Sequence, residues 1–237
     1  MDAAGYTTLT RQAGLMREMQ VVANNIANIS TNGFRREGVV FAEYVAALDD
    51  GPSLSMAHAT ARHVDLGQAG LSQTGGAFDF AIQGDGFFLI ETPQGQQLTR
   101  AGSFTPSATG ELVTADGFRL LDQGGAPVFI PPDAGQVAMG SDGTLSANGV
   151  PLGKIGLWHP TDPQQLQHQS GTMFASPSGV QPSEGGSVLQ GFLEESNVNP
   201  VSEIARMITV QRAYELGQTF LDREDARVRD VVQTLGK

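Results

Sequence analysis

The residues of this chain best suited to bind a metal are its dispersed histidines and aspartates. His63 and Asp65 could face the same side of a strand and form the most ligand-like pair, followed by His159 and Asp142. A metal site needs three or four converging ligands, and one histidine beside one carboxylate is far more often a surface hydrogen bond. The histidines are too dispersed to converge without help from the fold. We therefore expect no metal site.

Catalytic motifs are also missing from the sequence. There is no Gly-x-Ser-x-Gly elbow, no phosphate-binding loop and no His-Glu-x-x-His pair. The Asp-Gly dipeptides lack the alternating acidic ligands of a calcium loop. The absence of cysteine excludes disulfides and thiolate chemistry. We expect no catalytic residue and no cofactor, and a hydrolase that uses Asp and His is only a minor alternative.

Charge further limits the possible partners. The formal net charge is −11, and residues 51–200 hold 4 basic and 13 acidic residues, which accounts for −9 of it. Nucleic acids and anionic membranes require a basic surface, so neither is expected as a partner. No apolar run reaches the roughly 20 residues of a membrane span, and the N-terminus lacks the pattern of a cleavable signal. Composition alone would indicate a cytoplasmic protein.

The C-terminal segment predicts a long helix with an apolar stripe. Asn199 suits the N-cap, and Pro200 suits the first helical position, where a missing N–H costs nothing. Apolar residues then recur at an interval of seven, as in a coiled-coil seam. The predicted seam contains Met207, Val210, Tyr214, Leu221, Val228, Val231 and Leu235. Gly217 interrupts it, at a cost of about 1 kcal/mol in helix stability. A one-sided helix of this length, roughly 50 Å, needs a partner.

The N-terminal segment predicts a second helix over residues 4–30. Its apolar stripe contains Leu9, Leu15, Met16, Met19, Val22, Ala23, Ile26 and Ile29. Asn24, Asn25 and Asn28 are poor helix formers, because their amides compete for the backbone. Either they form hydrogen bonds across a helix–helix interface, or they mark a frayed end. Asn32-Gly33 stops the helix.

Between the two helices the pattern changes to short apolar runs separated by turns. We expect strands at 78–83, 87–91, 97–100, 111–114, 128–130, 153–158 and 187–192. Asp85-Gly86, Asp116-Gly117, Asp142-Gly143 and Asn148-Gly149 each suit a type I′ hairpin turn. Phe78, Phe80, Phe87 and Phe88 could line a ligand groove, but alternating strand aromatics are mostly core.

These patterns predict an α+β chain. Its N- and C-terminal helices form a coiled-coil domain around a central, irregular and mainly antiparallel β-domain. The expected divisions are a helical segment at 1–33, a linker at 34–59 anchored by Phe34 and Phe41, a β-domain at 60–196 and a helix at 197–237. Helices with an apolar stripe at both ends of a β-rich insert suggest a protein that polymerises.

Five groups of motifs resemble the bacterial flagellar rod and hook proteins. The N-terminal signature is Ala-Asn-Asn-Ile-Ala-Asn at 23–28 with Thr-Asn-Gly-Phe at 31–34. The C-terminal signature is Ser-Asn-Val-Asn-Pro-Val at 196–201 with Gln-Arg-Ala-Tyr-Glu at 211–215. Residues 81–88, 99–104 and 112–117 resemble the family's core motifs. The matches follow the family's order from about residue 4 to the end. The short middle domain argues against a hook protein, and the C-terminal tail is more similar to proximal-rod than to distal-rod members.

The resemblance implies a function and a location. The terminal helices would line the inner tube of an axial polymer that transmits torque for motility, with the β-domain outside. Partners would be copies of the chain and neighbouring rod subunits in the basal body, across the periplasm. The subunit would leave the cytoplasm through the flagellar type III export apparatus, without a cleavable signal. Distal-rod subunits are the nearest alternative, and a carbohydrate-binding β-module with dimerising helices is the alternative from another class.

Overall fold

The computed structural model describes residues 3–48, 51–183 and 185–236. The chain divides into two compact units, and each is assembled from segments far apart in the sequence. The helical unit contains residues 1–27, 37–63 and 199–237. The β-unit contains residues 28–36 and 64–198. The units therefore interleave along the chain, whereas the sequence suggested four successive segments.

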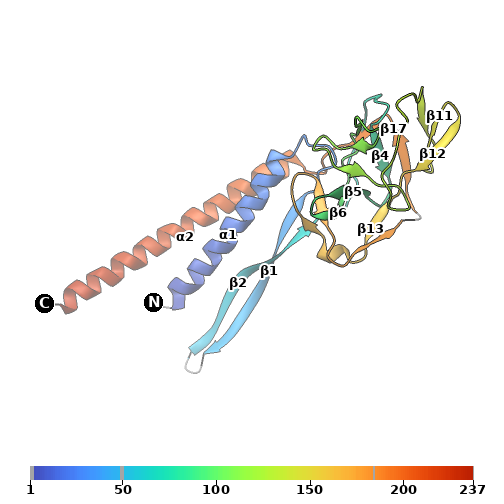
Figure 1. The fold of residues 1–237 in the computed structure, drawn as a ribbon. Coiled ribbons are helices and arrows are strands. Elements are labelled where there is room, and N and C mark those ends of the chain that lie inside the picture. The colour runs from blue at the N-terminus through green and yellow to red at the C-terminus, as the bar shows by residue number, and fades with distance from the viewer. Residues whose placement is uncertain (1–2, 49–50, 184, 237) are drawn as a thin grey trace. The chain divides into compact units, whose positions relative to one another are not determined.

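The helical unit consists of two helices and a β-hairpin. Helices α1 (Ala3–Ala27) and α2 (Pro200–Leu235) lie side by side, and α2 extends past the N-terminal end of α1 (Figure 1). As predicted, Asn199 caps α2, because its side chain accepts a hydrogen bond of 3.1 Å from the Ser202 backbone N–H. Proline follows the cap at the first helical position, where it has no N–H to leave unpaired.

The prediction of a linker over residues 34–59 is wrong, because most of this range forms a β-hairpin. Strands β1 (Glu37–Leu48) and β2 (Gly51–Val64) pair with each other over most of this range. The run Val-Val-Phe at 39–41 is β-branched and aromatic, which favours a strand. A two-stranded ribbon also satisfies backbone groups that a linker would leave to water.

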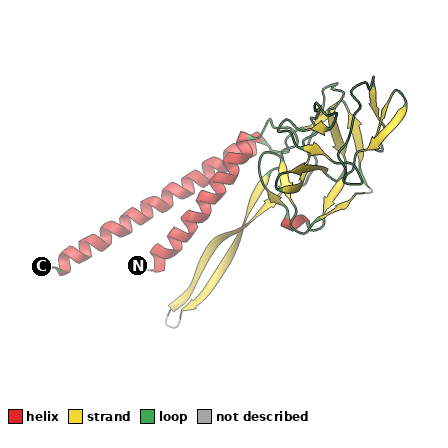
Figure 2. Cartoon of the chain, in the orientation of Figure 1, coloured by secondary structure: helices red, strands yellow, loops and turns green. Residues whose placement is uncertain are grey.

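The β-unit is built from short strands, and its ladders are antiparallel (Figure 2). The strands are β3 (Leu71–Gln73), β4 (Phe80–Gln83), β5 (Phe88–Thr92), β6 (Gly95–Thr99), β7 (Thr105–Pro106), β8 (Leu112–Val113), β9 (Arg119–Leu120), β10 (Val137–Met139), β11 (Thr144–Ala147), β12 (Val150–Lys154), β13 (Trp158–Pro160), β14 (Gln167–His168), β15 (Met173–Ala175), β16 (Val180–Pro182), β17 (Ser187–Gln190) and β18 (Phe192–Glu194). A short 3₁₀ helix, η1, spans Pro163–Gln165. The largest sheet has the order β14-β15-β6-β5-β9-β8-β7.

Most of the expected strands occur, with three exceptions, one of which is the run at 187–192, divided between β17 and β18. Residues 128–130 form no named strand, although Phe129 makes an isolated bridge with Glu111. The run at 153–158 is divided between β12 and β13. The strand aromatics are core residues: Phe80 and Phe88 lie in one buried cluster and Phe87 in a second, while Phe78 is partly buried. They are not available as a ligand-binding surface.

Only one of the four predicted type I′ turns forms as predicted. Asn148 and Gly149 both have positive φ, at 51° and 81°, and join β11 to β12. At the three Asp-Gly pairs the glycine alone has positive φ. Asp142 instead accepts hydrogen bonds from the backbone N–H and the hydroxyl of Thr144. These bonds lower the pKa of the Asp142 carboxyl below its usual value, as expected for a charged turn residue.

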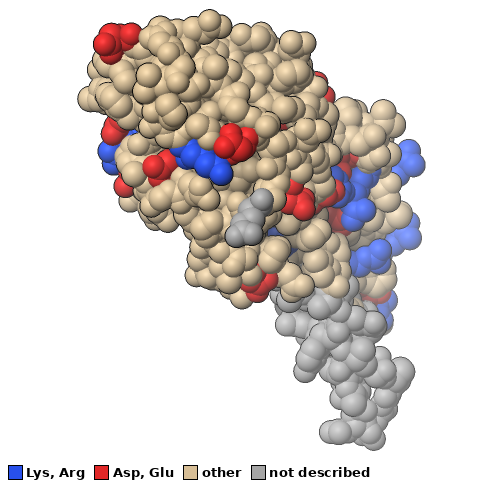
Figure 3. All heavy atoms as spheres, turned by 90° about the vertical axis from the view of Figure 1, so that its right-hand side faces the viewer, with Lys and Arg blue, Asp and Glu red and all other residues tan. Residues whose placement is uncertain are grey.

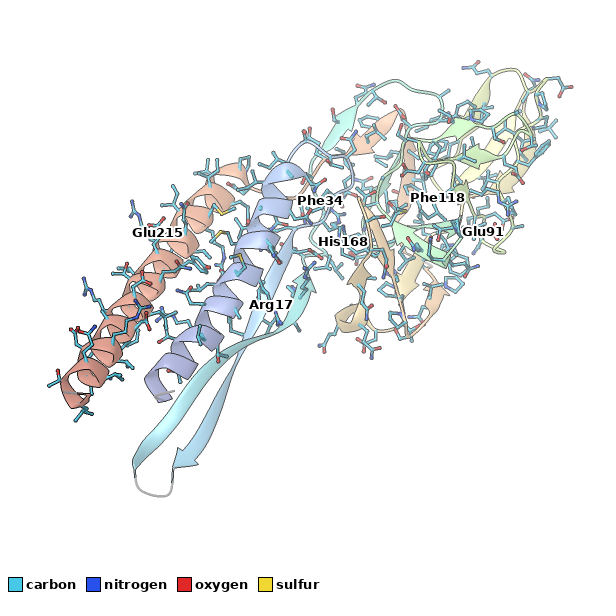
Figure 4. The ribbon with its side chains drawn as sticks, turned by 60° about the vertical axis from the view of Figure 1, so that its left-hand side comes forward. Arg17, Phe34, Glu91, Phe118, His168 and Glu215 are labelled. Atoms are coloured by element: carbon cyan, nitrogen blue, oxygen red, sulfur yellow. The ribbon has the colours of Figure 1, made fainter. Side chains whose placement is uncertain are left out.

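The segment that follows α1 and the segment that precedes α2 are hydrogen-bonded to each other in the β-unit. The Gly33 N–H donates to the Glu194 carbonyl at 2.7 Å, and the Asn197 N–H donates to the Phe34 carbonyl at 3.3 Å. A side chain at Gly33 would collide with the backbone of Arg100 and Ala101, so this position requires glycine. Phe34 is fully buried, and its ring lies edge-on to His168 at 5.9 Å (Figure 4).

A buried ion cluster lies beneath these two segments. The Glu194 carboxylate binds the Arg35 guanidinium at 2.6 Å and the Arg100 guanidinium at 3.0 Å, and all three side chains are buried. Arg100 also donates to the Gly84 carbonyl and lies over the Phe87 ring. Burial lowers the pKa of Arg100, and the charge of Arg35 adds to this effect, whereas Glu194 opposes it. Glu194 thus neutralises one of two buried cations.

We expect Glu194→Gln to destabilise the β-unit strongly. The variant leaves two guanidinium groups buried without a counter-charge, which costs about 3–5 kcal/mol. Trp158, the single tryptophan, lies in β13 and reports unfolding of this unit by its fluorescence in urea. Glu195→Gln removes an exposed neighbouring charge and should change stability by less than about 0.5 kcal/mol. Equal unfolding midpoints for the two variants would contradict a structural role for the cluster.

Candidate assembly interface

Helices α1 and α2 pair antiparallel, and polar side chains set their register. In the first half of α1, the Gln12 amide donates to the Tyr214 carbonyl at 2.8 Å. In the middle of α1, Glu18 forms an ion pair of 2.6 Å with Arg206. Near its end, the Asn25 amide donates to Glu203 at 3.1 Å. These contacts join residues whose separation along the chain decreases steadily, as antiparallel pairing requires.

The glycine in the predicted seam has a packing role. A Cβ at Gly217 would collide with the side-chain amide of Gln12. The glycine therefore makes room for the Gln12 amide, which is largely buried and reaches the Tyr214 carbonyl. The lower helix propensity of glycine is offset by this hydrogen bond in a buried setting.

The asparagine-rich end of α1 is an interface and not a frayed end. The fully buried Asn25 donates to the Glu37 carbonyl at 2.8 Å and accepts from the Glu37 N–H at 3.0 Å. Its amide also reaches the buried Glu203 of α2. One side chain thus joins α1, β1 and α2. Helix α1 ends at Ala27, where Asn28 accepts bonds from the backbone N–H and hydroxyl of Thr31.

The residues predicted for the α1 stripe are only partly brought together. Val22 is buried, and Leu15, Met19 and Ile26 are half-buried. Ile29 lies beyond the end of α1, in the β-unit. Leu9, Met16 and Ala23 share one face at an interval of seven, and all three are exposed.

The residues predicted for the α2 seam change from buried to exposed along the helix. Val210 is buried, and Met207, Tyr214 and Leu221 are half-buried. Val228, Val231 and Leu235 are between 49% and 81% exposed. Helix α2 has 36 residues and α1 has 25, which makes them about 54 and 38 Å long. Continuing the pairing register places Ala3 opposite about residue 223. The last turns of α2 therefore have no turn of α1 opposite them among the described residues.

A shallow groove of about 360 Å³ lies between the two helices beside the seam. Its lining includes Leu15 of α1 and Leu216 and Phe220 of α2. Leu216 and Phe220 are exposed, so apolar surface is available here as well as at the end of α2. Glu215 lies on the side of α2 away from α1 (Figure 4).

The contacts that the apolar pattern did not predict lie on the same face as the predicted ones. Glu203, Val210 and Gly217 are seven apart, and so are Glu18 and Asn25. A search for apolar residues alone passes over a seven-residue interval filled by a carboxylate, an amide and a glycine. The polar members of the interval were the available signal, and Asn25 was the one singled out.

The ligand-like residues of the sequence do not form a metal site among the described residues. No group of three or more His, Asp or Glu side chains there could hold a metal ion. Strand β2 ends at Val64, and Asp65 accepts from the Gly67 N–H in the following turn. His159 lies 2.8 Å from the Ser183 hydroxyl.

On the face of the β-unit in Figure 3, charged groups are scattered and form no basic patch. No described helix is long and apolar enough to cross a membrane.

Gly217→Ala should not deliver the stabilisation of about 1 kcal/mol that alanine normally gives in a helix. The new methyl group displaces the Gln12 amide and breaks its bond to Tyr214, at a cost of about 0.5–1.5 kcal/mol. In a Gln12→Ala background this conflict is absent, and Gly217→Ala should then give the full stabilisation of about 1 kcal/mol.

Thermal unfolding followed by helical circular dichroism measures the four members of this double-mutant cycle. We expect a coupling of about 1 kcal/mol between positions 12 and 217. Additive effects would mean that Gln12 and Gly217 are not in contact.

Family models match three parts of the chain. The model described as flagella basal body rod protein matches residues 6–35, which include most of α1. The model of the flagellar hook protein FlgE/F/G D1 domain matches residues 81–147. The model of the flagellar basal body rod FlgEFG protein C-terminal matches residues 189–234, which include most of α2.

Several curated relatives are similar over the whole chain. The flagellar basal-body rod protein FlgF of Mesorhizobium japonicum is 38% identical, over 100% of this chain and 99% of its own length. FlgF of Caulobacter vibrioides is 37% identical with the same coverage. FlgG of Bacillus subtilis is 30% identical over 96% of this chain and 97% of its own length. The identity to FlgF exceeds that to FlgG, and the chain belongs to the FlgF family of flagellar basal-body rod proteins.

Proposed function

We propose that this chain is a structural subunit of the proximal rod of the flagellar basal body, which polymerises through α1 and α2. The observation that carries this proposal is the incomplete seam of α2. Its inner face is apolar to the last turn, but only the first two thirds of the helix lie against α1. Apolar surface that a subunit cannot cover itself favours association with neighbours. Membership of the FlgF family supports the assignment.

Assembly accounts for the other features of the chain. The seam residues of α1 and α2 form the assembly interface, and neighbouring rod proteins and copies of the chain are the partners. The subunit reaches the basal body across the periplasm through the flagellar type III export apparatus, without a cleavable signal, and transmits torque as part of the drive shaft. The carbohydrate-binding alternative has less support, because Phe80, Phe87 and Phe88 are buried.

Leu221→Asp tests the role of the seam. The substitution places a carboxylate on the half-buried inner face of α2, at a cost of several kcal/mol when neighbours cover it. Cells that carry this variant as their sole copy should lose motility and fail to complete the rod. The level of the subunit should stay normal, because the β-unit still folds. Arg223→Asp, two residues away on an exposed position, should leave motility intact. Equal motility of the two strains would mean that the inner face does not serve assembly.

A non-catalytic role predicts tolerance at the ligand-like positions. His63→Ala, His159→Ala, Asp65→Ala and Asp142→Ala should each support normal motility, because none of them meets two further ligand side chains among the described residues. Asp142→Ala should lower the melting temperature modestly, since it removes the two bonds to Thr144. Elemental analysis of purified protein is the second measurement. Stoichiometric zinc or calcium, lost together with motility in one variant, would overturn the purely structural role.

A further inference from the structure

A small pocket lies in the β-unit, where strand β13 meets the residues that precede β5. The backbones of Phe87 and Trp158 exchange hydrogen bonds of 2.8 and 2.9 Å there. The pocket has a volume of about 420 Å³, which suits a small-molecule ligand. Leu66, Pro160 and Pro163 supply apolar walls. Its described lining residues all belong to the β-unit, so the pocket is separate from the seam of the helices.

Arg100 brings a buried positive charge to this pocket. Its side chain is only 3% exposed, and its guanidinium lies over the Phe87 ring. Nη1 donates to Glu194 and Nη2 to the Gly84 carbonyl, whereas Nε has no acceptor among the described residues. Buried donors in proteins are nearly always paired. The Nε–H is therefore a donor that a ligand in the pocket can satisfy.

Asp85 brings a negative charge to the same pocket, on an exposed side chain. Within the described ranges, its carboxylate accepts no hydrogen bond and forms no ion pair. Burial lowers the pKa of Arg100, and the charge of Asp85 opposes this effect, so the two groups interact across the pocket without being in contact. Two opposite charges with unused hydrogen-bonding capacity thus line one pocket.

The charges at and behind the pocket sum to zero. Arg35 and Arg100 are positive, and Glu194 and Asp85 are negative. A ligand with a single charge would upset this balance, which is unfavourable where water is partly excluded. A ligand that carries one charge of each sign preserves the balance and can meet both unused groups.

We propose that this pocket binds the zwitterion of an aliphatic α-amino acid. The carboxylate of the ligand accepts a charge-assisted hydrogen bond from the Arg100 Nε–H, and its ammonium group donates to the Asp85 carboxylate. The apolar walls pack against its side chain, where a third charge would find no counter-charge. This inference adds a ligand to the β-unit and does not depend on assembly of the rod.

Three probes with one carbon skeleton separate the two charges. Valine carries both groups, isovalerate lacks the ammonium group, and isobutylamine lacks the carboxylate. Each probe is titrated into the purified full chain, and the backbone amide NMR signals of Gly86 and Thr161, which line the pocket, are followed. Gly117, which does not line it, is the reference. We expect valine to bind saturably and to shift the first two signals only.

The other two probes should bind more weakly, to different extents. Isovalerate should have a dissociation constant about 3- to 5-fold higher than valine, because it loses only the contact with an exposed charge. Isobutylamine should have one at least about 10-fold higher, because it loses the bond to a buried charge.

Asp85→Asn and Asp116→Asn form a matched pair, because each removes an exposed carboxylate from an Asp-Gly turn and only Asp85 lines the pocket. Asp85→Asn should weaken valine binding about 3- to 5-fold and should not weaken isovalerate binding. Asp116→Asn should change neither. Arg100 is left unchanged in this test, because it also supports the buried ion cluster.

Several results would overturn the inference. One is the absence of saturable valine binding, and another is an equal affinity for the three probes. Tighter binding of isovalerate than of valine would overturn it in favour of a simple anion site. Equal valine affinities of the two variants would show that Asp85 does not contact the ligand. Each of these results leaves the rod function standing, since rod completion in cells measures that function independently.

Discussion

The pairing of the segment after α1 with the segment before α2 is the contact on which the rest of the structure depends. Glu194 serves it twice, through its backbone carbonyl to Gly33 and through its carboxylate to Arg35. Asn197 adds a short bond from the Arg36 N–H and donates to the Asp65 and Gly67 carbonyls. Because these segments are tied together, α1 ends and α2 begins close to each other. Antiparallel pairing of the two helices follows from that connection.

Buried polar groups set the register of the seam between the helices. Gln12, Glu18, Asn25 and Glu203 are all largely buried at or beside it. Buried polar contacts contribute little net stability, but a shifted register would leave them unpaired, at a cost of about 1–3 kcal/mol each. They therefore determine which residues face each other. The apolar side chains divide between the two environments: Val22 and Val210 are buried in the pair, whereas Leu9, Met16 and Val228 are exposed.

The sequence predicted those features that depend on local chemistry. The Asn199-Pro200 start of α2 and the Asn148-Gly149 turn each follow from the conformational preferences of two adjacent residues. The hairpin at 37–64 was missed because its two strands pair with each other across separate parts of the sequence, and no local pattern indicates that pairing. The cluster of Arg35, Arg100 and Glu194 was also missed, since its members meet only after the chain has folded. The role of Gly217 depends on Gln12, 205 positions earlier, and no local pattern indicates it.

Because α2 is longer than α1, one part of its apolar face packs within the subunit and another part remains uncovered for assembly. A seam of equal helices would cover its own apolar face and leave little to drive association. In the register set by the polar contacts, the first described residue of α1 lies opposite about residue 223 of α2. The apolar pattern of α2 continues beyond that point to Leu235. The uncovered part is short, and an isolated helical contact of two or three turns is weak in water. Single contacts between free subunits would therefore be transient, and they would become stable only where several neighbours hold a subunit at once.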